Sequence, residues 1–86
     1  MNKIFTNNGW EDYCYWQTED RKTLKKINDL LKDIERNGNT GKGKPEALIG
    51  NLSGFWSRRI NDKDRLIYKI DTENIYILSC RYHYQK

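Results

Sequence analysis

The side chains with the clearest chemical potential are arginines and a histidine in the C-terminal half of the sequence. Arg59 and Arg65 flank a short turn-like segment, and Arg81 and the single histidine, His83, lie close to the end. Arginine binds phosphate through paired N–H donors, and histidine titrates near neutral pH without help from its surroundings. Together with a carboxylate, these residue types suit cleavage of an RNA phosphodiester bond by the neighbouring 2′-OH.

That reaction needs a base for the 2′-OH and an acid for the departing 5′-oxygen, and it requires no metal. Glu46 is the candidate base and His83 the candidate acid. Simpler interpretations stay open: an exposed acid at Glu46, a surface histidine at His83, and a salt-bridged sheet face for the arginines. Cys14 and Cys80 with one histidine cannot complete a four-ligand zinc site, so both cysteines are expected to be reduced and buried.

Two helices are expected to support these residues. A strand over residues 3–5 precedes a helix that Thr6 or Asn7 can cap, and Trp10 and Tyr13 of this helix are expected in the core. Asp20 is a second N-cap, and Gly38 ends the helix that follows, over residues 21–36. That helix has an apolar stripe of five residues: Leu24, Ile27, Leu30, Leu31 and Ile34. Its polar residues, Asp33 among them, are expected to face outward.

The C-terminal half changes to a period of two, which predicts strands. Residues 55–60, 65–70 and 75–84 read as three strands, and the segments 61–64 and 71–74 read as turns between them. The expected fold class is therefore α+β: two N-terminal helices packed on a small antiparallel sheet, in the order β-α-α-β-β-β.

Hairpin geometry then brings basic residues together. Arg59 ends one strand and Arg65 begins its partner, so both lie at the same end of the sheet. If Leu66 and Leu78 both point toward the helices, the two-residue period puts three basic side chains on the open face. These are Arg65, Arg81 and His83.

Arg59 joins this open face only if its neighbour Arg58 faces the helices. A helix-facing arginine needs a carboxylate partner or a position at the edge of the sheet. The sequence therefore predicts a basic corner on an open sheet, with Arg58 as the residue that tests the assignment.

Composition limits the possible classes of function. The 86 residues include 16 Lys+Arg and 12 Asp+Glu, and the resulting charge of +4 favours a polyanionic partner, although it also serves solubility. No apolar segment approaches the ~20 residues of a membrane span, and no signal peptide is recognised. The glycine-lysine loop, residues 40–45, lacks the GxxxxGK[ST] spacing of a nucleoside triphosphate site.

Several segments together resemble one known family. GKGKPE at 41–46, NLSGFWSRRI at 51–60, RLIY at 65–68 and CRYHY at 80–84 are similar to the YoeB/Txe toxins of bacterial toxin–antitoxin pairs, within the RelE/ParE superfamily. The likeness extends over essentially the whole chain, which implies one toxin endoribonuclease domain over residues 1–86 with a microbial-RNase-like fold.

The resemblance implies a ribosome-dependent mRNA endonuclease that cuts the codon in the ribosomal A site. By position, Glu46 is the general base, His83 the general acid and Arg65 the residue that stabilises the transition state. Tyr84 is implied to orient the substrate. The residues implied to bind RNA are Arg59, Lys42, Lys44 and Arg81.

The resemblance also implies the partners. These are a cognate YefM/Axe-type antitoxin with an acidic C-terminal segment, the ribosome with its A-site mRNA, and a second copy in a homodimer. A cytoplasmic location follows, with no cofactor, metal or membrane. Two departures affect the site: Ile49 replaces a basic residue common in the family, and Gln85 and Lys86 extend the chain past Tyr84.

Two alternatives use the same residues differently. The gyrase-poisoning branch of the superfamily keeps the fold and does not need Glu46 and His83 in acid and base positions. A non-catalytic RNA-binding module would use the arginines and aromatic rings for phosphate and stacking contacts alone.

Overall fold

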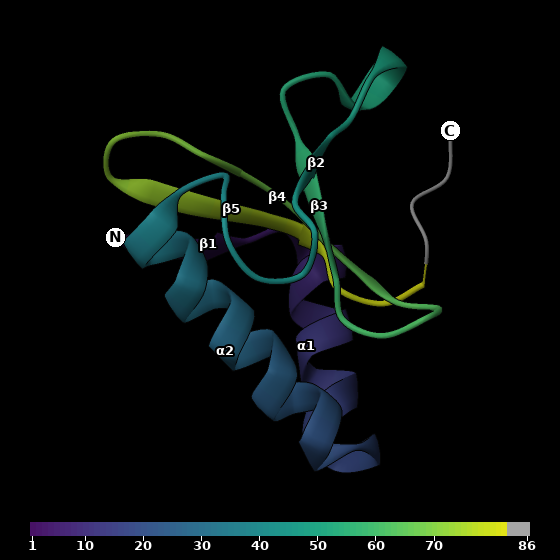
Figure 1. Cartoon of the computed structure of the whole chain (residues 1–86). Helices are drawn as coiled ribbons and strands as arrows, with labels where there is room; N and C mark the ends of the chain where they lie inside the picture. The colour runs from purple at the N-terminus through teal and green to yellow at the C-terminus, as the bar shows by residue number, and fades with distance from the viewer. Residues whose placement is uncertain (83–86) are drawn as a thin grey trace.

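A computed structural model describes residues 1–82, which form an α+β arrangement of a five-stranded sheet and two helices (Figure 1). Both helices lie against the same face of the sheet. The elements in chain order are β1 (Asn2–Phe5), α1 (Asn7–Glu19), α2 (Arg21–Asn37), β2 (Glu46–Ala47), the 3-10 helix η1 (Gly50–Leu52), β3 (Trp56–Arg59), β4 (Arg65–Ile70) and β5 (Asn74–Ser79). This confirms the predicted fold class.

The helix boundaries follow the predicted caps. Thr6 Oγ1 accepts the Gly9 N–H at 3.0 Å, and the Asp20 carboxylate accepts the N–H groups that open α2. Gly38, at φ +65°, ends α2 and donates its N–H to the Ile34 carbonyl. The predicted apolar stripe of α2 lies in the core; its buried members are Ile27, Leu30, Leu31 and Ile34.

The prediction for α1 was partly wrong. Trp10 is 51 % exposed, whereas Trp16 is buried and its indole N–H donates to the Cys80 carbonyl at 2.8 Å. Tyr13 packs partly against the core. Cys80 is buried as predicted, but Cys14 is only half-buried, and both cysteines are free. No helix within residues 1–82 is long and apolar enough to cross a membrane.

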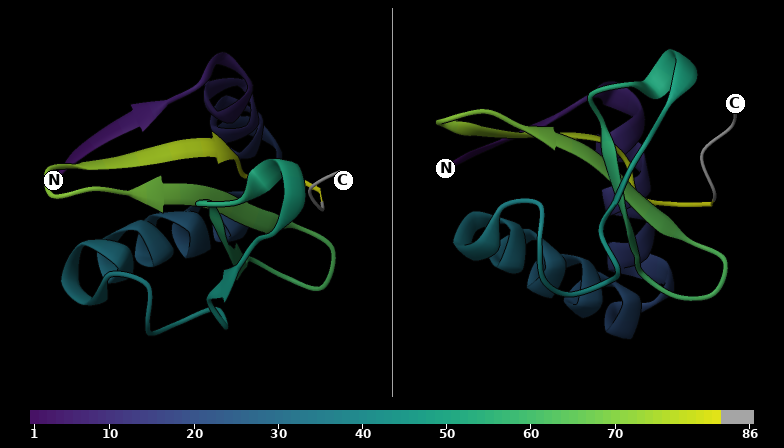
Figure 2. Two further views of the ribbon diagram at one scale, coloured as in Figure 1. Left: turned by 90° about the horizontal axis from the view of Figure 1, so that it is seen from above. Right: turned by 45° about the horizontal axis from the view of Figure 1, so that its top comes forward.

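The sheet is mixed rather than purely antiparallel. Its strand order is β1-β5-β4-β3-β2, and β1 pairs with β5 in parallel while the other neighbours are antiparallel. The view from above in Figure 2 shows β1, β5 and β4 side by side. A local pattern cannot reveal this parallel pair, because almost the whole chain separates its two strands.

A β-bulge in β5 removes the condition on which one face assignment depended. Ile67 pairs with Ser79 and Tyr68 with Ile77, so Leu78 is an extra residue without a partner in β4. Ile77 is fully buried, as is Ile75, and Leu78 is only half-buried, so the condition that both Leu66 and Leu78 point toward the helices is not met. The bulge shifts the alternation by one residue, which returns Cys80 to the core.

The last strand is also shorter than predicted. It ends at Ser79, because the Cys80 N–H leaves the ladder and donates to the Asp12 carboxylate of α1 at 3.0 Å. Burial raises the pKa of that Asp12 carboxyl. The chain after the sheet is therefore tied to α1 instead of continuing β5.

Candidate active site

Arg59 and Arg65 are directly opposed on β3 and β4. Directly paired residues of antiparallel strands point to the same face, about 4.5–5.5 Å apart at Cα. Arg59 is exposed, and the Arg65 guanidinium donates to the carbonyls of Asn61 and Asp64 at 2.8 and 3.1 Å. Within residues 1–82 neither arginine forms an ion pair, so the two positive charges are available to an anion.

Glu46 belongs to the same face. It lies in the two-residue strand β2 opposite Ser57, and Ser57 is two residues before Arg59 on β3. Since the side-chain period of a strand is two, Glu46, Ser57 and Arg59 point the same way. The Glu46 side chain is exposed. The structure therefore brings the predicted base and both predicted phosphate-binding arginines to one face of the sheet, opposite the helices.

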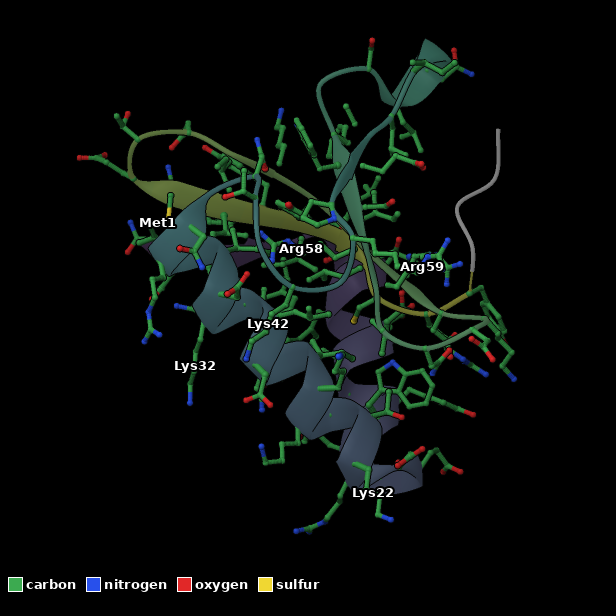
Figure 3. All side chains as sticks on the ribbon, viewed as in Figure 1. Met1, Lys22, Lys32, Lys42, Arg58 and Arg59 are labelled. Carbon is green, nitrogen blue, oxygen red and sulfur yellow. The ribbon has the colours of Figure 1, made fainter. Side chains whose placement is uncertain are left out.

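Arg58 points to the opposite side of β3 from Arg59, as the labelled side chains in Figure 3 show. It is fully buried, and the carboxylate that a helix-facing arginine needs comes from Asp33 of α2, at 2.5 Å. Asp33 was predicted to face outward, which is wrong. The Arg58 guanidinium beside it, followed by the Lys42 N–H, lowers the pKa of the Asp33 carboxyl to about 2.

Arg58 also fixes the glycine-lysine loop. Its two terminal nitrogens donate to the carbonyls of Gly38, Thr40 and Lys42 at 2.6–2.9 Å, and its Nε donates to the Tyr68 hydroxyl at 3.1 Å. With Asp33 included, all five N–H donors of the guanidinium have an acceptor. The buried Arg58 thus fixes the loop from the helix-facing side of β3.

Lys42 and Lys44 extend from this loop and are exposed. Gly43 lies between them at φ +82°, and its carbonyl accepts the Arg59 N–H at 2.7 Å. A Cβ at Gly43 would lie 3.1 Å from the Arg59 carbonyl oxygen, so the close approach of loop and strand depends on glycine. The two lysines therefore follow the edge of β3 near Arg59.

Ile49 lies on the loop between β2 and β3, which projects away from the helices in Figures 1 and 2. Its side chain is 79 % exposed. The position where the resemblance implies a basic residue therefore presents an apolar side chain to solvent.

Arg81 is turned toward α1 rather than toward the two opposed arginines. Its guanidinium lies over the Tyr15 ring, 3.5 Å from the ring centroid, and also over the Tyr82 ring, at 4.5 Å. His83 and Tyr84, the predicted acid and orienting residue, lie outside the described residues, as do Gln85 and Lys86.

Sequence reasoning missed Asp64, which is 1 % exposed although it lies in a predicted turn. One carboxylate oxygen accepts the Tyr82 N–H at 2.6 Å, and the other accepts the Asn61 side-chain amide at 3.0 Å. An aspartate in an Asn-Asp-Lys-Asp turn is normally an exposed residue that hydrogen-bonds the backbone of the turn. Only the return of the chain after β5 buries it.

The comparisons with known proteins point to one family. Residues 5–84 match the family model described as YoeB-like toxin of bacterial type II toxin-antitoxin system. Toxin YoeB of Escherichia coli K12 is 51 % identical over 84 residues, which is 98 % of this chain and 100 % of that protein. Toxin YoeB of Streptomyces coelicolor is 52 % identical with the same coverage.

Solved structures are similar over the whole fold. A YoeB/ParE toxin from Agrobacterium tumefaciens superposes with a TM-score of 0.94 at 38 % identity, covering 98 % of this chain and 100 % of that one. Staphylococcus aureus YoeB superposes at 0.92 and 53 % identity over 98 % of both chains, in a heterotetrameric complex with YefM and as a dimer. This chain therefore belongs to the YoeB-like toxin family of bacterial type II toxin–antitoxin systems.

Proposed function

We propose that this chain is a metal-independent endoribonuclease that cuts mRNA in the ribosomal A site and so arrests translation. The observation that carries the proposal is that Glu46, Arg59 and Arg65 share the face of the sheet opposite the helices. A carboxylate on the same face as two guanidinium groups that form no ion pair within residues 1–82 can accept the proton of a 2′-OH while the cations hold the adjacent phosphate. Action on ribosomes implies that the protein works in the cytoplasm.

Each proposed catalytic residue has one step. Glu46 takes the proton of the 2′-OH, and the 2′-oxygen forms a bond to phosphorus. Arg65 stabilises the charge that develops on the phosphate oxygens. The bond from phosphorus to the 5′-oxygen breaks, and His83 gives a proton to that oxygen. The products are a 2′,3′-cyclic phosphate, open to hydrolysis to a 3′-phosphate, and a 5′-OH.

The remaining residues bind and orient the RNA. Arg59 places the scissile phosphate, and Tyr84 orients the nucleotide. Lys42 and Lys44, which extend from the loop that Arg58 fixes, contact the sugar-phosphate backbone of the RNA.

An antitoxin would neutralise the same face. The Staphylococcus aureus relative forms a heterotetramer with YefM, and it also forms a dimer. For this chain we propose a YefM/Axe-type partner whose acidic segment pairs with Arg59 and Arg65 and excludes RNA. We also propose a homodimer, because the Staphylococcus aureus relative forms a dimer.

Primer extension on a reporter mRNA in a purified translation system tests the activity. With ribosomes, the wild type should produce new 5′ ends within the A-site codon, and Glu46→Gln and His83→Gln should each lower the rate at least ~10²-fold. Translation arrest without new ends would mean a binding block. Cleavage of free RNA at the same rate would reject ribosome dependence, and DNA damage without mRNA cleavage would indicate a gyrase poison.

A further inference from the structure

Tyr82 combines an exposed ring with an unusual backbone. The residue is 53 % exposed, although a tyrosine ring is large and partly apolar. Its φ is +63°, in the left-handed region that bulky residues rarely adopt. Backbone outliers of this kind persist where the surroundings hold them, and they cluster at functional sites.

Two hydrogen bonds hold the backbone of Tyr82 in this conformation. Its N–H donates to the buried carboxylate of Asp64 at 2.6 Å, and its carbonyl accepts the Arg65 N–H at 3.1 Å. The second oxygen of Asp64 is occupied by Asn61, so the carboxylate is fixed in turn. Both polar groups of the Tyr82 backbone are therefore anchored, which fixes the point from which its side chain extends.

The Tyr82 ring also packs against the guanidinium group of Arg81. The Arg81 guanidinium lies over it at 4.5 Å from the centroid and over the Tyr15 ring at 3.5 Å. Tyr15 belongs to α1 and packs partly against the core, in edge contact with the buried Trp16. Guanidinium groups stack on aromatic faces, so Tyr15 and Arg81 back the Tyr82 ring and leave its exposed part open to solvent.

The backbone that carries this ring lies beside the strand end from which Arg65 extends. The hydrogen bond to the Arg65 backbone places Tyr82 next to Arg65, which is itself opposed to Arg59. Two guanidinium groups suit a phosphate, and an anchored flat ring suits a base. These are two parts of one stretch of nucleic acid.

We propose that the Tyr82 ring is a stacking platform for a nucleobase of the RNA strand whose phosphate Arg59 and Arg65 hold. The inference rests on the proposed function and adds a base contact to it. Stacking of a base on an aromatic side chain changes binding by about 5- to 150-fold when the ring is removed.

Tyr82→Gly removes the ring and tolerates the left-handed backbone, so it separates stacking from folding. Tyr82→Asn is the second such variant, since asparagine also tolerates positive φ. Single-turnover cleavage on ribosomes programmed with one defined mRNA should be ~5- to 150-fold less efficient for both. Trp10→Ala is the matched control, because Trp10 is equally exposed but packs on Phe5 and Tyr13 instead, and it should cut like the wild type.

Abasic nucleotides, placed one at a time around the cut, identify the stacked base. An abasic nucleotide at one position should lower the cleavage efficiency of the wild type by a similar factor. The same nucleotide should not lower the efficiency of Tyr82→Gly any further, because removing the ring and removing the base abolish the same contact. Tyr82→Phe should keep the sensitivity of the wild type. Equal sensitivity of wild type and Tyr82→Gly at every position would reject the platform and leave the endonuclease standing. A wild type that cuts no mRNA would reject both.

Discussion

Replacement of Arg58 by methionine should destabilise the protein far more than the same replacement of Arg59. The two residues are adjacent and of one type, but Arg58 is fully buried and Arg59 is exposed. Methionine fills most of the volume of the arginine stem and carries no donor. The change therefore tests the five hydrogen bonds of the guanidinium rather than the packing of its stem.

The magnitude follows from the groups left behind. Arg58→Met removes the charged partner of Asp33 and the donors to three loop carbonyls and one tyrosine hydroxyl. Breaking a buried ion pair by removing one partner costs about 3–5 kcal/mol. A domain of this length has a total stability of roughly 4–13 kcal/mol, so the loss is a large share of the total.

Urea denaturation followed by circular dichroism measures the difference. With an m-value of about 1 kcal/mol/M, the midpoint of Arg58→Met should fall by about 3–5 M, or the variant should be unfolded without urea. In a thermal melt the same loss lowers Tm by at least ~12 °C. Arg59→Met should stay within ~0.5 kcal/mol of the wild type, as surface changes usually do.

Equal midpoints for Arg58→Met and Arg59→Met would refute the reasoning. That result would mean that water replaces the guanidinium donors at little cost, and that the loop does not depend on Arg58.

Three further outcomes are expected. The pKa of the Asp33 carboxyl is about 2 in the folded protein, against an ordinary value of 3.8, so its contribution to stability is complete above pH ~4 and is lost as the pH falls through 2. The urea midpoint of the wild type should therefore exceed that of Asp33→Asn by less and less as the pH falls through this window. A difference in midpoint that does not change with pH would contradict the lowered pKa. Gly9→Ala should cost about 1–3 kcal/mol in the same titration, with Asn8→Ala as the neutral control, because a Cβ at Gly9 would lie 2.5 Å from the Ile77 carbonyl oxygen. Burial raises the pKa of the Cys80 thiol to about 12, so iodoacetamide at pH 8 should modify Cys80 only after unfolding. Peptide mass spectrometry measures the modification. A modified Cys80 in the folded protein would contradict the burial of this thiol.

The sequence alone determined most of the secondary structure. The apolar stripe from Ile27 to Ile34 and the caps at Asp20 and Gly38 are local signals, and they produced α2 as predicted. The turn at 61–64 likewise fixed the hairpin, and with it the opposition of Arg59 and Arg65. These features depend only on residues close together in the chain.

The family resemblance also came from the sequence, because it rests on contiguous segments such as 51–60. The comparisons confirm it. The roles of Glu46 and His83 remain predictions, to be decided by the cleavage experiments.

Only the tertiary structure decided which polar groups are buried. Asp33 and Arg58 are 25 positions apart, and neither residue pattern indicates that each compensates the charge of the other. Asp64 is buried only because the chain returns to it at Tyr82. The bulge at Leu78 likewise depends on the pairing with β4. A short window of sequence records propensity and period, whereas burial and ion pairing arise from contacts between segments that folding alone brings together.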